Sequence, residues 1–236
     1  MDSLATPFTA TAWQACFARM EQISGRPLTS RQCSDLQQYS QMLLEANRHF
    51  NLIGPSAVEN LLSRHLLDAL PLLPFLPPKA RVADLGSGGG LPGIVLAILS
   101  QPPQRIHLIE SIGKKARFLQ EVVTQLALSD RVRVSAQRAE ALGAAEKKTY
   151  DRVVSRALGS LRYGGELAAP LLRPGGAYLV LKGRNHADEF AEWRRAPVSR
   201  LFQEPVVHAL HDEGDSVIVQ LIKKVRPANA GRQSNQ

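Results

Sequence analysis

The segment Val82-Ala83-Asp84-Leu85-Gly86-Ser87-Gly88-Gly89-Gly90-Leu91-Pro92-Gly93 decides the fold. It begins as an apolar strand that carries a carboxylate near its end, continues as a glycine-rich turn and leads into a second apolar stretch. Glycine lets the backbone turn sharply and approach a ligand that a side chain would exclude. The segment therefore predicts a strand, a ligand-binding turn and a helix.

Around this segment, short apolar runs alternate with amphipathic stretches, which is typical of a parallel sheet covered by helices. Helices are expected at 93–99, 114–127 and 161–172, with a short turn near Glu140. The predicted strands are 81–85, 105–110, 132–135, 151–155, 177–182, 204–210 and 216–222. The last two strands should form a hairpin-like pair. We expect an α/β fold with a Rossmann-like, seven-stranded, mostly parallel sheet.

The N-terminal part has helical rather than strand periodicity. Apolar residues recur at helical spacing through 13–23 and 36–50, and a further helix is expected from Ser56 to about Leu70. Thr29 with Gln32, and Ser56 with Glu59, have capping-box spacing. A proline-rich segment at 71–78 should end this part. We therefore predict an N-terminal helical segment at 1–78, a Rossmann-like domain at 79–225 and a disordered tail at 226–236.

The composition limits the class of protein. Lys and Arg number 29 against 21 Asp and Glu, a formal charge of +8, which favours a polyanionic partner such as nucleic acid. There is no apolar stretch of membrane-spanning length and no signal-peptide pattern at the start, so we expect a cytoplasmic protein without a membrane partner. The two cysteines, Cys16 and Cys33, lack the spacing of a zinc site, so no metal is expected.

Two cofactors suit the glycine turn. Residues 88–93 match the dinucleotide-binding pattern G-x-G-x-x-G, and Glu110 follows about 20 residues later, where a carboxylate can bind ribose hydroxyls. A dinucleotide would bring a pyrophosphate, which Asp84 would repel. S-adenosylmethionine brings an ammonium group and no phosphate, so Asp84 favours it. We expect S-adenosylmethionine, bound by Asp84, Gly86, Gly88 and Glu110, and keep an NAD-dependent oxidoreductase as the alternative.

The sequence resembles the bacterial small-subunit ribosomal RNA guanine-N7 methyltransferases, also called the glucose-inhibited division protein B family. The similar segments follow the family order between residues 47 and 183. They are Asn51-Leu52, Arg64-His65-Leu66-Leu67-Asp68, the turn Asp84 to Gly93, Glu110-Ser111-Ile112-Gly113-Lys114-Lys115, Phe118-Leu119, Arg138-Ala139-Glu140, Ser155-Arg156-Ala157 and Leu181-Lys182-Gly183. The resemblance implies methyl transfer from S-adenosylmethionine to N7 of a guanine in 16S ribosomal RNA.

The resemblance also implies roles for individual residues. It assigns cofactor binding to Gly86, Leu91, Ala139, Glu140 and Arg156, with Glu110 and Ser111 at the adenosine. Two positions depart from the family pattern. The family commonly has Asp where this chain has Glu110, which keeps the carboxylate, and an aromatic residue where it has Leu158.

The expected chemistry agrees with the residues at the end of the fourth strand. Guanine N7 is a free lone pair, so the absence of an obvious general base does not count against its methylation. Enzymes that methylate exocyclic amines usually carry an Asn/Asp-Pro-Pro-aromatic motif where this chain reads 155–158, and cytosine carbon-5 methylation needs a cysteine that the predicted domain lacks. Arg156 is the candidate catalytic residue, because it lies where open α/β sheets bind ligands.

The expected partner is 16S ribosomal RNA or the small ribosomal subunit, bound by a monomer. Candidate RNA-binding residues are His65, Lys114, Lys115, Arg138 and Lys182. His65 lies near an apolar stripe, which favours a core histidine over an RNA contact, and the lysines are equally interpretable as a solvated surface. Methylation of another RNA site or of a small molecule by the same fold, and a binding module without catalysis, remain alternatives.

Overall fold

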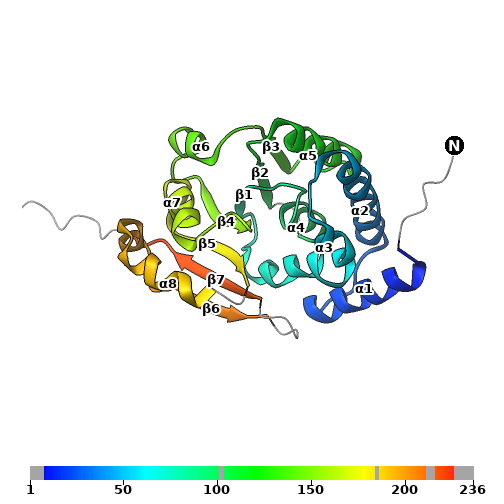
Figure 1. The fold of residues 1–236 in the computed structure, drawn as a ribbon, viewed down its shortest axis with the longest axis horizontal. Coiled ribbons are helices and arrows are strands. Elements are labelled where there is room, and N and C mark those ends of the chain that lie inside the picture. The colour runs from blue at the N-terminus through cyan, green and yellow to red at the C-terminus, as the bar shows by residue number, and fades with distance from the viewer. Residues whose placement is uncertain (1–7, 101–103, 184–185, 211–215, 226–236) are drawn as a thin grey trace, which may run out of the picture.

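The computed structural model describes residues 8–100, 104–183, 186–210 and 216–225, and the expected disordered tail lies outside them. Seven strands form one sheet in the order β3-β2-β1-β4-β5-β7-β6 (Figure 1). The strands are β1 (Arg81–Leu85), β2 (Arg105–Ile109), β3 (Val132–Ser135), β4 (Tyr150–Arg156), β5 (Leu172–Lys182), β6 (Val206–Ala209) and β7 (Val217–Ile222). The first five pair in parallel, while β7 runs antiparallel to both neighbours. The predicted fold class and terminal pair are confirmed.

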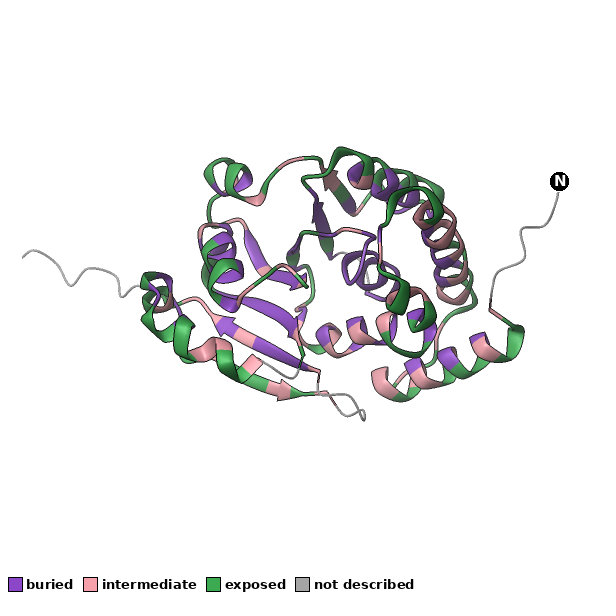
Figure 2. Cartoon of the chain, viewed as in Figure 1, coloured by how far each residue is buried: buried purple, intermediate pink, exposed green. Residues whose placement is uncertain are grey.

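Helices cover both faces of the sheet, so its central strands are buried on both sides (Figure 2). One face packs against α4 (Gly93–Leu99) and α5 (Gly113–Gln125). The other packs against α6 (Ala139–Ala145), α7 (Leu161–Leu171), α8 (His186–Arg195) and the 3₁₀ helix Pro197–Leu201. Alternation along β4 shows the two faces, because Val154 joins the first core and Val153 the second.

The N-terminal helices share a hydrophobic core with the sheet. Residues of α1 (Ala10–Ser24) and α2 (Ser30–Phe50) belong to the same buried cluster as those of α4 and α5. The predicted cap of α2 is present, with Thr29 and Gln32 bonded as a capping box. The N-terminal segment is thus packed against the sheet domain, and α2 lies beside the glycine turn.

The prediction of a single helix from Ser56 to about Leu70 is wrong. The chain instead forms α3 (Pro55–Glu59), a π-helical turn (Leu61–His65) and a 3₁₀ helix (Leu67–Phe75). Gly54 is the N-cap of α3 and the expected Ser56 cap is absent, because Pro55 has its φ angle preset for the first helical position. The helical part also continues beyond the predicted end at residue 71, because the 3₁₀ helix includes Pro71 and Pro74 and ends at Phe75. Such 3₁₀ segments commonly connect longer elements.

Further differences lie in the C-terminal half, where β5 begins at Leu172 rather than at residue 177 and the expected turn near Glu140 is the helix α6. Helix α8 was not predicted, because its sequence is mostly polar and buries chiefly Trp193. Strand β6 begins at Val206 rather than at residue 204 and is largely exposed. No helix in the described part of the chain is long and apolar enough to cross a membrane. Among the same residues, no group of three His, Cys, Asp or Glu side chains could hold a metal ion.

Candidate cofactor and substrate site

The glycine turn connects β1 to α4 at the carboxyl edge of the parallel strands. Gly86, Gly88 and Gly90 have φ angles of 68°, 54° and 97°, in the left-handed region that L side chains rarely adopt. A Cβ at Gly88 would meet only the Gly86 carbonyl oxygen, at 3.7 Å. The turn therefore needs glycine at these positions for its backbone shape, and at Gly88 it leaves open space beside the backbone.

Asp84 lies beneath this turn and organises it. Its Oδ2 accepts a hydrogen bond from the Gly93 amide at 3.1 Å, and a Cβ at Gly93 would collide with the same oxygen. Its other oxygen, Oδ1, has no hydrogen-bond partner among the described residues. The side chain is 1% exposed, and burial raises its pKa to about 7, although the charge of Arg156 acts in the opposite direction. The role that the geometry displays is to hold the turn against α4.

Glu110 fastens the turn from the neighbouring strand. Its Oε2 accepts from the Gly88 amide at 2.9 Å and its Oε1 accepts from the Ile112 amide at 2.8 Å, so the carboxylate joins the turn to the segment after β2. Ser87 supports the same junction, since its hydroxyl donates to the Asp84 carbonyl and accepts from the Ile109 amide. A carboxylate has further lone pairs beyond these two bonds and can accept from ribose hydroxyls. Ser111, the next residue, is exposed.

Tyr39 of α2 covers the turn from the N-terminal segment, a contact that the sequence analysis missed. Its hydroxyl is fully buried and donates to the Gly89 carbonyl oxygen at 2.8 Å. Cβ atoms at Gly89 and Gly90 would lie 2.9 Å from Leu43 and 3.1 Å from the Tyr39 hydroxyl. These two glycines therefore allow α2 to pack closely on the turn.

Arg156, at the end of β4, meets His65 and Asp68 from the N-terminal segment. Its Nη1 lies 2.7 Å from His65 Nδ1 and 3.6 Å from Asp68 Oδ2. The side chain of Arg156 is 20% exposed, that of His65 16% and that of Asp68 17%, so all three are mostly removed from solvent. The structure thus brings together two predicted site residues, His65 and Arg156, with the Asp68 carboxylate beside both.

The third part of the edge follows β3. Ala139 begins α6, and Arg138 and Glu140 on either side of it are exposed. The Glu140 carboxylate accepts a hydrogen bond from Tyr163 at 3.2 Å. These residues lie across the sheet from Arg156, because β3 and β4 are separated by β2 and β1. The predicted cofactor residues are therefore spread along the carboxyl edge of four adjacent strands.

Comparison with known proteins identifies the family. A family model described as rRNA small subunit methyltransferase G matches residues 32–218 of the 236. The chain belongs to this family. Among curated members named ribosomal RNA small subunit methyltransferase G, it is 41% identical to that of Rhodospirillum centenum over 85% of this chain and 86% of the relative. It is 39% identical to that of Chloroflexus aggregans over 80% of this chain and 75% of the relative.

Solved structures agree on the fold of this family member. M. jannaschii TYW2, solved in complex with AdoMet, matches 68% of this chain and 76% of its own with a TM-score of 0.53 at 15% identity. The YcgJ protein of Bacillus subtilis matches 67% of this chain and 99% of its own with a TM-score of 0.52 at 13% identity. At these identities the likeness concerns the fold alone.

The predicted RNA-binding lysines fall into two groups in this family member. Lys114 is exposed at the start of α5, with its Nζ 5.7 Å from the centre of the Phe50 ring, and Lys115 is half-buried beside it. Lys182 differs, because its side chain is only 10% exposed and its ammonium donates to Glu189 of α8 at 2.8 Å. Its charge is already balanced within the protein, so its assignment to RNA stays a prediction.

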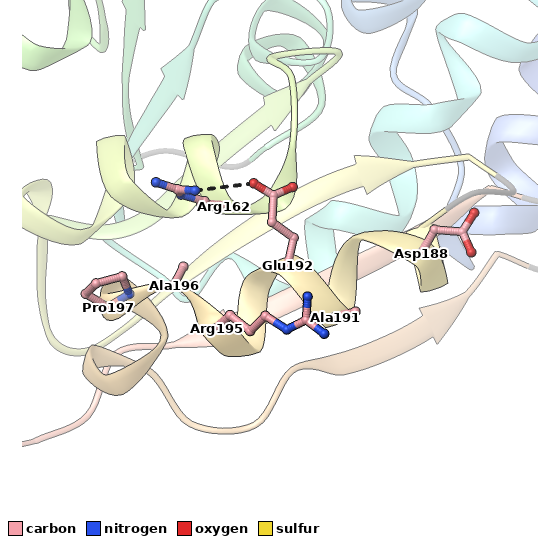
Figure 3. Close-up of a pocket in the computed structure, with 7 residues that line it drawn as sticks. All are labelled: Arg162, Asp188, Ala191, Glu192, Arg195, Ala196 and Pro197. Carbon is pink, nitrogen blue, oxygen red and sulfur yellow. Dashed lines mark ion pairs between the residues drawn. The ribbon is translucent and has the colours of Figure 1, made fainter.

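A hollow of about 460 Å³ lies between α7 and α8, away from the glycine turn (Figure 3). Arg162 and Glu192 face each other across it at 3.6 Å, and Arg195 lies beside them. None of the predicted site residues lines it. It lies away from the glycine turn and the carboxyl ends of the parallel strands, so we keep the carboxyl edge of the sheet as the candidate site.

Proposed function

We propose that this protein transfers a methyl group from S-adenosylmethionine to N7 of a guanine in 16S ribosomal RNA. Membership of the rRNA small subunit methyltransferase G family supports the methylation of ribosomal RNA. The observation that carries the cofactor is the glycine turn held between two buried carboxylates, Asp84 and Glu110. The choice of 16S RNA and of N7 rests on the family resemblance of the sequence.

The residues of the carboxyl edge fit S-adenosylmethionine. Gly88 leaves room for close approach to the backbone, and Glu110 is placed to accept from ribose hydroxyls. Ala139 and Glu140 would lie toward the adenine and Arg156 toward the methionine carboxylate. When bound, the cofactor would supply an activated methyl group. The two acidic side chains, Asp84 and Glu110, lie against a turn without a counter-charge of its own, which favours a ligand end that carries an ammonium group over a pyrophosphate, although the raised pKa of Asp84 makes its share of this charge partial at pH 7.

The work of the protein in this reaction is orientation. Guanine N7 has an available lone pair, so no side chain needs to remove a proton before it attacks. The enzyme has only to hold the base in line with the methyl group and exclude water, which can supply a large part of a rate enhancement. A turn fixed by Asp84, Glu110 and Tyr39 provides the rigidity that such alignment requires.

The RNA would lie across the same edge, on a surface that combines positive charge with exposed apolar side chains. Lys114 and Lys115 begin α5, close to Phe50 and Ile112, which are 39% and 45% exposed. Phosphates are bound by such lysines, and single-stranded bases stack on exposed aromatic rings. The formal charge of +8 agrees with this partner.

The direct test is methylation with labelled S-adenosylmethionine of two substrates, protein-free 16S RNA and assembled small subunits, followed by mass spectrometry of the digested nucleosides. We expect 7-methylguanosine from at least one of the two. Label on an exocyclic amine or on cytosine would contradict the N7 assignment. Tight binding of NADH with none of S-adenosylhomocysteine would contradict the cofactor.

A further inference from the structure

The hydrogen bond between His65 and Arg156 fixes the proton on the imidazole. A guanidinium only donates hydrogen bonds, so His65 Nδ1 must accept from Nη1 at 2.7 Å. The ring is therefore neutral, with its proton on Nε2. Asp68 Oδ2 lies 3.5 Å from the same Nδ1 and 3.6 Å from Arg156 Nη1, beyond strong hydrogen bonding but close enough to balance the guanidinium charge.

One edge of the Arg156 guanidinium stays available. Among the described residues, its partners His65 and Asp68 both approach Nη1. Nε and Nη2 make no hydrogen bond with the described part of the chain. These two donors form a planar fork that matches a carboxylate or phosphate group. The pair from the N-terminal segment thus holds one side of the guanidinium and leaves the other for an anion.

The backbone on both sides of this contact is unusual. Ala157, directly after Arg156, has a φ angle of 54°, in the left-handed region that costs a non-glycine residue about 1 kcal/mol. His65 closes a π-helical turn, a rare form that occurs frequently at functional sites. Strained backbone persists where the surroundings hold it and gathers at ligand sites. The backbone is therefore unusual on both sides of the contact, next to Arg156 and at His65.

The position of Arg156 in the sheet indicates which anion it faces. Arg156 lies near the glycine turn, because β4 pairs with β1 with Val154 opposite Asp84, and a Cβ at Gly86 would lie 2.7 Å from Leu158, two residues after Arg156. The strand order is β3-β2-β1-β4, with about 4.8 Å between neighbours. A ligand whose ribose is bound at Glu110, directly after β2, and whose base points toward β3 has its other end near β4. In S-adenosylmethionine that end carries a carboxylate.

We propose that His65 and Asp68 are positioning residues that hold Arg156 for the carboxylate at the amino-acid end of S-adenosylmethionine. The N-terminal segment then completes the cofactor site. His65 accepts from one edge of the guanidinium and directs the other edge to the ligand, while Asp68 balances its charge. This inference rests on the proposed function only in taking S-adenosylmethionine as the cofactor.

The test compares two probes by calorimetry. S-adenosylhomocysteine has the amino-acid end, and 5′-methylthioadenosine has the same nucleoside without it. For His65→Ala we expect about tenfold weaker binding of S-adenosylhomocysteine, the loss of one charge-assisted hydrogen bond, and binding of 5′-methylthioadenosine within about twofold of wild type. His65→Asn, whose amide oxygen replaces the Nδ1 acceptor, should restore S-adenosylhomocysteine affinity to within about threefold.

The matched control is Arg64→Ala on the same π-helical turn, because Arg64 donates to Ser216 and does not contact Arg156 in the structure. It should leave both affinities unchanged. Equal weakening of both probes by His65→Ala would overturn the proposal, since it would place the effect in the nucleoside pocket or the fold. Unchanged S-adenosylhomocysteine affinity would overturn it as well. Neither result tests the proposed function, which fails if the wild-type protein does not bind S-adenosylhomocysteine or does not form 7-methylguanosine in 16S RNA.

Discussion

Replacing Asp84 by Asn should change how the stability of the protein depends on pH. Burial raises the pKa of Asp84 in the folded protein to about 7, from an ordinary value of 3.8. Between these values the folded state holds a proton that the unfolded state has released. The free energy of unfolding therefore falls as pH rises from about 4 to about 7, and it levels off above that.

The magnitude follows from the shift. Each pH unit well inside this window costs about 1.4 kcal/mol and the slope falls near pH 7, so the wild type should lose about 2 kcal/mol between pH 5 and pH 7 from this group alone. His107 acts oppositely, because burial lowers its pKa to about 4 and its contribution grows as pH rises toward 6.5. The wild-type curve therefore mixes two slopes. Subtracting the curve of Asp84→Asn, which retains His107, isolates Asp84.

The measurement is urea unfolding of both proteins at pH 5, 6, 7 and 8. Relative to wild type, Asp84→Asn should become more stable by about 2 kcal/mol from pH 5 to pH 7 and change little further at pH 8. Asp130→Asn is the control, because Asp130 is exposed and its removal should leave the pH dependence nearly unchanged. A difference between wild type and Asp84→Asn that stays constant from pH 5 to pH 8 would refute the reasoning.

Three other perturbations test separate features. Tyr39→Phe leaves the buried Gly89 carbonyl without its donor, so urea unfolding should give a loss of about 1–2 kcal/mol, and a loss below about 0.3 kcal/mol would contradict the contact. Burial lowers the pKa of His107 to about 4, so between pH 6.5 and pH 4 the unfolded protein binds a proton that the folded protein does not. The stability of the wild type relative to His107→Asn should therefore fall by about 3 kcal/mol as pH falls from 7 to 4. A difference between the two proteins that does not change with pH would be inconsistent with a buried neutral imidazole. Reversing Lys114 and Lys115 to Glu should weaken RNA binding at low salt and lower the slope of log affinity against log salt by about 2, with S-adenosylhomocysteine affinity unchanged by calorimetry.

The control for the last change is the reversal of Lys147 and Lys148 to Glu. These two lysines are likewise adjacent in the sequence and both are exposed, but they precede β4, at the amino edge of the sheet. They carry the same charge change away from the proposed RNA surface. Equal loss of RNA affinity in both double variants would show that net charge, and not the start of α5, determines binding.

The local parts of the site could be predicted from the sequence. A strand, a glycine run and a helix follow one another within twelve residues, and Glu110 ends the next strand along the chain. Parallel strands place their carboxyl ends on one edge, so spacing along the chain was enough to bring Glu110 to the turn and Arg156 to the same edge. Short-range pattern and sheet geometry together determine these positions.

The contacts from the N-terminal segment could not be predicted in the same way. Tyr39 lies 50 residues from Gly89 and occupies the apolar stripe of α2, where it looks like an ordinary core residue. His65 lies 91 residues from Arg156, on a π-helical turn where an α-helix was expected. Lys182 pairs with Glu189 in a helix that the periodicity did not reveal. Each depends on packing between segments that are distant in sequence.

The packing of α2 also separates the two cofactor interpretations that the sequence left open. In the dinucleotide pattern 88–93, the second glycine lets the backbone approach a pyrophosphate. Here that residue is Gly90, and the space beside it is filled by Tyr39 and Ile94 of the protein itself. The Gly88 amide already donates to Glu110, so it is not free for a phosphate. The sequence matches the dinucleotide pattern, but here its glycines are needed for the shape of the turn and for the contact with α2. A pyrophosphate would therefore lack the free backbone amides that it needs as hydrogen-bond donors.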